Sequence, residues 1–449
     1  MKSNMRIIIV WGMWGPYHCR RFEAFRSYAA GQGYPVTGVS LFSGSSVNQW
    51  RVESLPEGVV HIDLGKDEAR FPFGKIAGLL SIPWKLRPDV AFLPVYDHWP
   101  LTLYAALRLW GGRVVMMNDG HAGTARAVGL RALIKRHVAR EFDAGFVAGA
   151  PHRRYTASLG LPVEKIFTGY DAVDNDYFAL RAGQIQERKE EIRIQYGLPE
   201  RYFLSLGRFV AKKNLPALMR AYRMFLDSNR ASQVHLVTVG SGEEDAKLRS
   251  LCQTLRLPVY DKTSARPDNC ATKTQDEPPG VHFYGLRQIQ ENPVFYALAE
   301  AFVLASLWEE WGLVVNEAMA SGLPVIVSET AGCAEDLLKP LSPAMASTAC
   351  ASSLGSPEPP GVLLRQNGYV FDPHSPESLA QALLALAANP ALRLVMGNAS
   401  RAIVDTFSCA AFARNALLAA RTANGESISA PRPDSAAEAQ VDVVGGQAL

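Results

Sequence analysis

The chain has 449 residues, more than one ordinary hydrophobic core accommodates, so we expect two domains. Hydrophobic residues make up 48% and charged residues 20%, as in soluble globular proteins, and a formal net charge of +3 does not indicate nucleic acid as a partner. The 6 cysteines are scattered without a C-x-x-C motif or a cysteine–histidine cluster. This argues against a zinc site and a disulfide framework and suits a reducing cytoplasm.

The first residues, MKSNMRIIIVWGMWGPYHCRR, contain too short an apolar run for a secretory signal and lack a small-residue cleavage site. No stretch reaches the roughly 18 uninterrupted apolar residues of a membrane span. We therefore expect a cytoplasmic protein.

Short apolar, β-branched runs alternate with helical stretches through the first part of the chain. Predicted strands cover residues 6–12, 35–43, 89–95, 113–119 and 144–150. This alternation predicts a doubly wound α/β domain over 1–190. The charged stretch QERKEEIRIQYG, residues 186–197, is a predicted helical connector.

The same alternation returns in the second part and predicts another doubly wound domain over 195–400, facing the first. Its predicted strands cover residues 202–208, 234–240, 281–285, 300–306 and 324–329. Two aperiodic stretches rich in Pro, Ser, Ala and Thr, at about 255–280 and 340–362, are predicted exposed insertions. Residues 401–423 are a predicted helix that packs back on the first domain, and 424–449 a disordered tail.

The segment EEWGLVVNEAMASGLPV follows the predicted strand 300–306, at the sheet edge where open α/β folds bind ligands. A helix starting near Leu313 would point the amides of Gly312, Leu313 and Val314 outward, where they can bind an anion. Glu309 and Glu317 would flank that anion and accept hydrogen bonds from vicinal hydroxyls. The pattern favours a nucleotide sugar, although either acid could also be a solvated residue near a helix end.

The segment LGRFVAKKN follows the first predicted strand of the second domain. It places Gly207, Arg208 and Lys213 at the same sheet edge, where the two cations could neutralise a diphosphate. The alternative is a solvated basic turn. Gly240, in VGSGEE, adds a third glycine-bearing loop at this edge.

At these residues the chain resembles glycosyltransferase family 4, a family of retaining enzymes with the GT-B fold. The family's E-x7-E motif matches Glu309 and Glu317, and its G-R-x4-K motif matches Gly207, Arg208 and Lys213. VHFYG, YALAEAFVLAS and NGYVFDP also match the family's second domain, and the resemblance covers about 6–420 without the insertions. In YDAVDNDYF, aspartate and alanine replace the family's usual Asn-Gly.

The resemblance implies two facing Rossmann-like domains, the first for the acceptor and the second for a UDP- or GDP-linked sugar. Arg208 and Lys213 would bind the diphosphate, Glu309 the sugar hydroxyls and Glu317 the ribose. A hexose would pass with retention to a lipid-linked, saccharide or small-molecule acceptor, as in polysaccharide biosynthesis. We expect no cofactor and no divalent metal, because the cationic pair would stabilise the leaving diphosphate.

Two other functions stay open at this point. A nucleotide-sugar epimerase can share this fold and would interconvert the free donor without an acceptor. A catalytically silent sugar-nucleotide binding module is the second alternative, and the complete set of Arg208, Lys213, Glu309 and Glu317 argues against it.

The first domain departs from the family pattern. Its first loop is WGMWGPYHCRR, where Gly15 could approach the diphosphate and His18 the acceptor, unless His18 belongs to a helix start. Asp119 occupies the place where the family often has a histidine, and His121 follows shortly after. We take Asp119 and His121 as catalytic candidates.

Asp97 and His98 end the preceding predicted strand and are acceptor-side candidates. The basic amphipathic stretch LRALIKRHVAREF and the stretch FPFGKIAGLLSIPWKLRP suit either outer helices or a peripheral contact with the inner membrane face.

Overall fold

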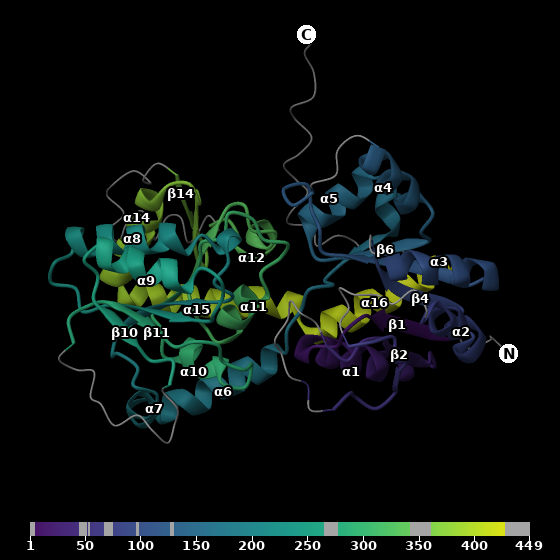
Figure 1. The fold of residues 1–449 in the computed structure, drawn as a ribbon, viewed down its shortest axis with the longest axis horizontal. Coiled ribbons are helices and arrows are strands. Elements are labelled where there is room, and N and C mark those ends of the chain that lie inside the picture. Colours follow the sequence, from purple (N-terminus) through teal and green to yellow (C-terminus); the bar gives the residue numbers. More distant parts are fainter. Residues whose placement is uncertain are drawn as a thin grey trace, which may run out of the picture.

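The computed structural model describes residues 5–44, 52, 54–66, 75–95, 98–125, 130–264, 277–341 and 361–426. Asp97, most of the tail predicted at 424–449, and residues 265–276 and 342–360 of the two predicted insertions lie outside the described residues. Two lobes stand side by side, each built around its own sheet (Figure 1).

The first lobe holds a seven-stranded parallel sheet in the order β3-β2-β1-β4-β5-β6-β7. Its strands are β1 (Ile7–Trp11), β2 (Val36–Ser40), β3 (Val59–His61), β4 (Val90–Pro94), β5 (Arg113–Asn118), β6 (Ala144–Val147) and β7 (Ile166–Thr168). Its helices are α1 (Pro16–Ala30), α2 (Ile76–Leu86), α3 (His98–Trp110), α4 (Leu130–Arg140) and α5 (Ala150–Ser158), with the 3₁₀ turn η2 (Val163–Lys165). The central strand β1, IIIVW, is buried throughout, because helices cover both faces of a parallel sheet.

The second lobe holds an eight-stranded sheet in the order β10-β11-β9-β8-β12-β13-β15-β14, parallel except for the β14–β15 pair. Its strands are β8 (Tyr202–Leu206), β9 (His235–Val239), β10 (Val259–Asp261), β11 (Val281–Phe283), β12 (Ala301–Leu304), β13 (Val325–Ser328), β14 (Val362–Arg365) and β15 (Gly368–Phe371). Its helices are α8 (Leu215–Ser228), α9 (Asp245–Thr254), α10 (Asn292–Ala297), α11 (Leu313–Ala320), α12 (Ala334–Leu337), α14 (Pro376–Ala388) and α15 (Pro390–Val404), with the 3₁₀ turn η3 (Ala211–Lys213). The two doubly wound α/β domains predicted from the sequence are therefore present.

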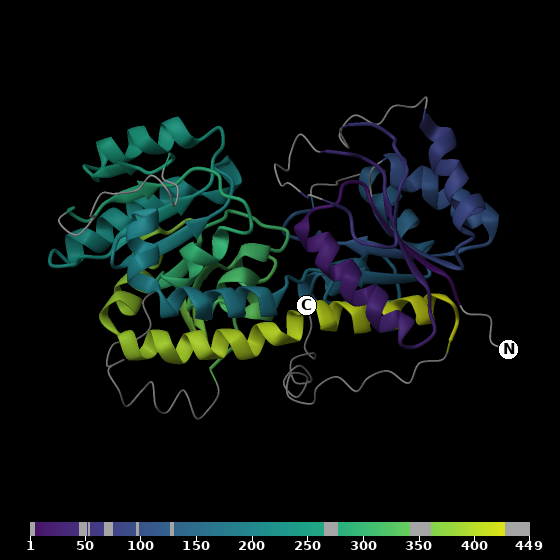
Figure 2. The same cartoon turned by 90° about the horizontal axis from the view of Figure 1, so that it is seen from below.

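The chain crosses between the lobes twice. The first crossing runs through α6 (Asn175–Glu187) and α7 (Lys189–Tyr196), and the second through α15, η4 (Asp405–Phe407) and α16 (Cys409–Ala423). Seen from below, α15 and α16 form a nearly continuous bar under both lobes (Figure 2). The helix α16 packs against α1 and the strands β5, β6 and β7. The last described helix of the chain therefore belongs to the first domain.

Several details of the sequence prediction were wrong. The strand β10 lies inside the insertion predicted at about 255–280, where it pairs with β11. The short strands β3 and β7 were not predicted, because runs of 3 residues give too little periodicity. The antiparallel pair of β14 and β15 was not predicted either. The connector predicted at 186–197 is two helices, since α6 ends at Glu187 and α7 begins at Lys189.

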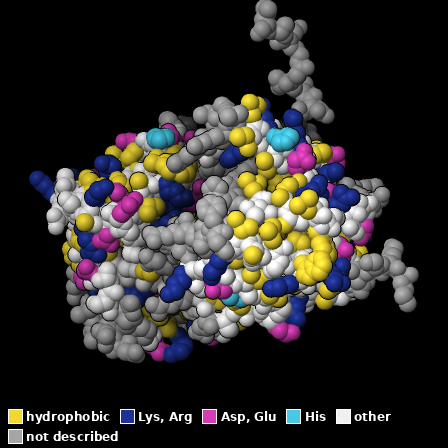
Figure 3. All heavy atoms as spheres, turned by 45° about the vertical axis from the view of Figure 1, so that its right-hand side comes forward, with side chains coloured by type: hydrophobic (Ala, Val, Ile, Leu, Met, Phe, Trp, Pro, Cys, Tyr) yellow, Lys and Arg dark blue, Asp and Glu magenta, His cyan; other side chains and the backbone are white. Residues whose placement is uncertain are grey.

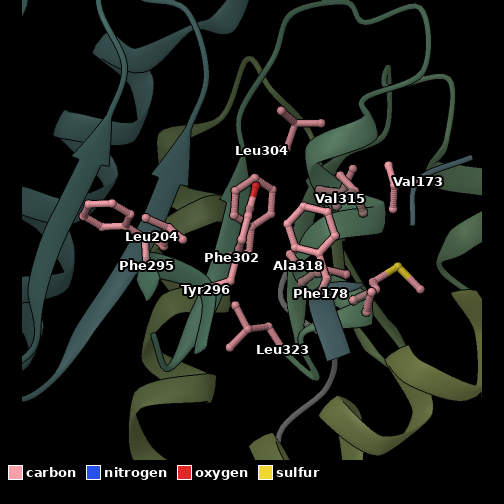
Figure 4. Close-up of a cluster of buried hydrophobic side chains, with 14 of the residues drawn as sticks. Val173, Phe178, Leu204, Phe295, Tyr296, Phe302, Leu304, Val315, Ala318 and Leu323 are labelled. Atoms are coloured by element: carbon pink, nitrogen blue, oxygen red, sulfur yellow. The ribbon is translucent and has the colours of Figure 1, made fainter. Parts of the chain in front are cut away.

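One hydrophobic cluster lies where the two domains meet. It combines Val173 and Phe178, from the first crossing, with Phe302, Val315 and other residues of the second domain (Figure 4). Contacts of this kind fix how the carboxyl edges of the two sheets face each other.

Within the described residues, no single helix has the length and apolar composition needed to span a bilayer. The helix pair Pro376–Ala388 and Pro390–Phe407 meets these criteria only together and is bent by 105°.

Candidate active site between the two domains

A cleft of about 520 Å³ lies between the carboxyl edges of the two sheets. The first domain and the crossing segment contribute Tyr17, Asp119 and Asp171 to its walls, and the second domain contributes the loops after β8, β9, β11 and β12. Most of the residues predicted for the donor line this cleft: Gly207, Arg208, Lys213, Gly240, Glu309, Gly312, Leu313 and Val314.

Glu309 is buried at the bottom of the cleft between two ammonium groups. Its carboxylate pairs with Lys213 and, at 3.0 Å, with Lys212, and it accepts a hydrogen bond of 3.2 Å from Ser306 Oγ. Burial raises the pKa of Glu309, but Lys213 and Lys212 outweigh it and hold that pKa below its usual range. Glu309 is therefore an anion held in place by cations.

Three cations from one segment line this wall of the cleft. Lys212 Nζ also pairs with Glu310 at 2.6 Å, whereas Arg208 is exposed and makes no ion pair with the described residues. Lys212 and Lys213 both belong to the turn η3, which follows β8. The three cations outnumber the carboxylates of Glu309 and Glu310 by one, which suits an anionic ligand such as a diphosphate.

The helix α11 begins at the cleft, as predicted. Gly312 precedes it with a φ of 106°, a left-handed conformation that favours glycine. The amides of Leu313 and Val314 are in the first turn and have no acceptor within the helix, so they can donate to an anion.

Gly240 allows the loops after β8 and β9 to pack closely at the same sheet edge. A Cβ atom on Gly240 would lie 1.9 Å from the carbonyl oxygen of Gly207, so the loops after β8 and β9 touch backbone to backbone. This contact sets the width of the cleft beside Arg208.

Glu317 does not line the cleft, which differs from the expectation that it faces the ligand. The residue is 0% exposed and accepts hydrogen bonds from Tyr17 Oη, from Tyr296 Oη at 2.8 Å and from Asn292 Nδ2 at 3.5 Å. Burial raises the pKa of Glu317 to about 7, although these hydrogen bonds oppose the shift. Tyr17, from the other domain, closes the network on the cleft side.

Asn292 is the second residue that separates Glu317 from the cleft. Its Oδ1 has no hydrogen-bond partner among the described residues, although the side chain is buried. A buried acceptor of this kind is costly unless a ligand donates to it.

His121 lies behind the Glu309 loop instead of in the cleft. Its Nδ1 accepts a hydrogen bond from the amide of Gly123, so Nε2 carries the proton and donates to the carbonyl oxygen of Glu309 at 3.0 Å. The predicted catalytic contact for His121 is therefore replaced by a contact that holds the backbone of Glu309.

A second histidine, His152, makes the same kind of bond to the next carbonyl. It accepts from the amide of Gly149 and donates Nε2–H to the carbonyl oxygen of Glu310 at 2.8 Å. Burial lowers the pKa of His152 to about 4, which keeps the ring neutral at neutral pH. Two histidines of the first domain thus hold consecutive carbonyls of the acidic loop in the second domain.

Asp119 lines the cleft opposite the lysines and keeps surface open to it. Loss of solvation by the surrounding protein raises the pKa of Asp119, and the negative charges of Asp171 and Glu310 raise it further. Asp171 is buried and pairs with Arg21 Nη2 at 3.1 Å, so its charge is partly compensated.

Gly15 and His18 lie at the start of α1 and do not line the cleft. The amide of Gly15 donates to His18 Nδ1 at 2.9 Å, and the His18 ring packs on Trp11. The structure therefore places His18 in a helix start, the alternative weighed for it, and the predicted contacts of Gly15 with diphosphate and of His18 with acceptor are not supported by this geometry. Asp97 and the His98 side chain lie outside what the structure describes.

Several residues of the site escaped the sequence prediction: Tyr17, His152, Asp171, Lys212, Asn292 and Glu310. One signal was present in the sequence. GPYH, ending at His18, and GAPH, ending at His152, share a glycine and histidine at the same spacing, and both form the same helix cap. No group of three or more His, Cys, Asp or Glu side chains in the described part of the chain is arranged to hold a metal ion.

Residues 200–389, which carry the lysines and the acidic loop, match the family model for "Glycosyl transferases group 1". This part of the chain therefore resembles a group 1 glycosyltransferase domain. Among curated relatives, mannosylfructose-phosphate synthase of Agrobacterium fabrum is 27% identical over 166 residues, 37% of this chain and 32% of the relative. Alpha-monoglucosyldiacylglycerol synthase of Streptococcus pneumoniae is 31% identical over 143 residues, 31% of this chain and 27% of the relative. This chain thus matches about a third of the length of these relatives.

Solved structures extend the likeness of the glycosyltransferase domain to the whole fold. A glycosyltransferase from Rickettsia africae has a TM-score of 0.66 at 15% identity and covers 95% of this chain and 100% of its own. Anabaena HepE, solved in complex with UDP and glucose, has a TM-score of 0.59 at 13% identity and covers 92% and 98%. At these identities the likeness shows the fold, which is GT-B: two parallel-sheet domains with a cleft between them.

Proposed function

We propose that this protein transfers a hexose from a nucleoside diphosphate sugar to an acceptor hydroxyl, with retention and without a metal ion. The observation that carries this proposal is the position of Glu309 between Lys212 and Lys213, with Arg208 lining the same cleft, beside the start of α11. The diphosphate would lie on Arg208, Lys212 and Lys213, with the amides of Leu313 and Val314 completing its contacts.

In this pose Glu309 would face the hydroxyls of the donor sugar, because it is the buried acid next to the phosphate site. The leaving diphosphate gains negative charge as the glycosidic bond breaks, and the preorganised cations stabilise that charge. Asp119, on the opposite wall, would contact the acceptor hydroxyl. Its raised pKa makes it a stronger proton acceptor than an ordinary carboxylate.

The acceptor is proposed as a class: a saccharide, a lipid-linked sugar or a small molecule. The relatives include a synthase of a sugar phosphate and a synthase of a glycolipid, so likeness to them supports both a small-molecule and a lipid acceptor.

The direct test is incubation with a panel of UDP- and GDP-linked hexoses, with nucleoside diphosphate release followed with and without added acceptors. Release that depends on an acceptor supports the proposal, and the anomeric configuration of the product tests retention. Conversion of the free donor sugar into its epimer without an acceptor would instead identify an epimerase.

Metal independence has its own test. Lys212, Lys213 and Arg208 supply positive charge at the place where Mg²⁺ would neutralise a diphosphate, so turnover should persist in excess EDTA. The control is a restoration series with Mg²⁺ and Mn²⁺. Activity that is lost on chelation and restored by either ion would contradict this part of the proposal.

A further inference from the structure

The outward faces of α2 and α3 are apolar, where helices on a soluble surface usually carry polar side chains. On α3 the exposed stripe is Leu101, Ala105 and Leu109, and the Leu109 side chain is 91% exposed. On α2 the exposed residues include Leu80 and Trp84, one turn apart, and Trp84 is 68% exposed. Both helices therefore lack the polar outer face that their position predicts.

The two helices form one surface. They pack against each other, and the rings of Trp84 and Trp110 meet edge to face with centroids 5.7 Å apart. The neighbouring helix α4 adds exposed Leu133 and Ile134. Figure 3 shows hydrophobic side chains gathered on the side of the first domain that is turned to the viewer.

The charges on these three helices have one sign. Their sequences, IAGLLSIPWKL, HWPLTLYAALRLW and LRALIKRHVAR, contain no aspartate and no glutamate. Exposed Lys85, Arg136 and Arg140 border the apolar side chains. By contrast, the outer helices α1 and α7 mix acids and bases, with Arg20 beside Glu23 on α1.

We propose that this surface, the α2–α4 face, binds an anionic lipid bilayer. The α2–α4 face consists of Leu80, Trp84, Leu101, Leu109, Trp110, Leu133 and Ile134 with the cations Lys85, Arg136 and Arg140. Tryptophan and leucine would enter the headgroup boundary, while the cations contact lipid phosphates.

The charges favour lipid over a second copy of the chain. Two identical faces brought together would place like cations against each other, because the helices have no acid to pair with them. A bilayer with anionic headgroups provides both an apolar layer and the opposite charge.

The α2–α4 face also reaches the edge of the cleft. The helices α3 and α4 follow β4 and β5 in the chain, so they begin at the sheet edge that carries Asp119. A bilayer on this face would lie beside the first-domain wall of the cleft. Lipid binding by this face does not depend on sugar transfer, since it can occur without a nucleotide-sugar donor.

The test is vesicle flotation of the full chain with two compositions, phosphatidylcholine alone and phosphatidylcholine mixed with phosphatidylglycerol. One variant is Trp84→Ser with Leu109→Ser, and the other is Arg136→Gln with Arg140→Gln. The matched controls lie on the second domain: Leu394→Ser, at a side chain 68% exposed like Trp84, and Arg230→Gln, at an exposed arginine.

We expect the parent chain and both controls to float with anionic vesicles, less so at high salt. The arginine variant should lose roughly fivefold in affinity for each cation removed, and the apolar variant about tenfold or more. Failure of the parent to bind anionic vesicles would overturn the proposal, as would equal losses in the controls. A parent dimer that the apolar variant dissociates, without vesicle binding, would assign the face to a second copy and also overturn it.

Discussion

Glu309 and Glu317 are close in the chain but lie in opposite surroundings. Glu309 is held by Lys212 and Lys213 and has a lowered pKa, whereas Glu317 has hydroxyl and amide donors and a raised pKa. Glu309 faces the cleft, and Glu317 is sealed from it by Tyr17.

Although Glu309 and Glu317 belong to one E-x7-E motif, their different surroundings suit them to different tasks. A carboxylate between cations stays charged and can respond to charge that develops on a reacting sugar. A carboxylate surrounded by hydroxyl donors is suited to exchange one hydroxyl for another, and a ribose hydroxyl could replace that of Tyr17. The first environment suits the chemical step and the second suits donor recognition.

The largest effect is expected from Glu309→Gln. Turnover should fall on the order of a hundredfold or more, as when a preorganised electrostatic contact is removed. Affinity for nucleoside diphosphate should stay equal or rise, because Lys212 and Lys213 lose a competing anion. Steady-state kinetics and calorimetry measure the two quantities separately.

Glu310→Gln is the matched control, because Glu310 pairs with Lys212 nearer the surface of the same loop. It should change turnover much less. A Glu309→Gln protein that loses diphosphate affinity and keeps its turnover would reverse the roles assigned to the two acids.

The next effect concerns stability and pH. The Glu317 pKa of about 7 means that the native state keeps a proton that the unfolded chain releases near pH 4.5. The free energy of unfolding of the parent should therefore fall as pH rises between these values. Glu317→Gln cannot titrate, so its stability relative to the parent should rise over that interval, on the order of 2 kcal/mol.

Denaturant titrations from about pH 4 to about pH 7 measure this difference in the free energy of unfolding, to which each titrating group contributes separately. The control is Glu164→Gln at an exposed glutamate, which changes the net charge equally. A pH-independent difference between Glu317→Gln and the parent would show that Glu317 ionises in the native state like a solvated glutamate.

The domain architecture could be predicted because central parallel strands are buried on both faces and appear as unbroken apolar runs, as in IIIVW of β1. The short strands β3, β7 and β10 lie toward the sheet edges, where 3 residues do not establish a period. The strand β15 was not predicted either, although all of its residues are buried, so burial alone did not decide which strands the sequence predicted.

The residues of the candidate site also fall into those that could be predicted from the sequence and those that could not. Residues that share one loop, such as Arg208 and Lys213, could be predicted because their spacing is visible in the sequence. Both of them line the cleft. The contacts of Tyr17 with Glu317 and of His152 with Glu310 join distant parts of the chain. No local pattern shows which residues meet across two domains, so these roles needed the structure.

The smallest effect is expected at Tyr17, the first-domain residue that donates a hydrogen bond to Glu317. Tyr17 Oη occupies an acceptor position on Glu317 that a ribose hydroxyl would take, so it competes with the donor. Tyr17→Phe keeps the ring and removes the competing hydroxyl. Nucleoside diphosphate should therefore bind about threefold to tenfold more tightly, equivalent to the net worth of one hydrogen bond. Calorimetry measures this gain.

Two comparisons decide whether the gain arises at the ribose. Tyr296→Phe removes the other tyrosine hydroxyl on Glu317, but Tyr296 does not line the cleft, so that variant should not gain affinity. With 2′-deoxy and 3′-deoxy nucleoside diphosphates, the Tyr17→Phe gain should disappear for the analogue that lacks the hydroxyl which replaces Tyr17. Weaker binding by Tyr17→Phe would mean that Tyr17 contacts the donor directly. An equal gain for both deoxy analogues and the parent ligand would mean that the variant merely loosens the domains. In either case Glu317 would no longer be the ribose acceptor that Tyr17 conceals.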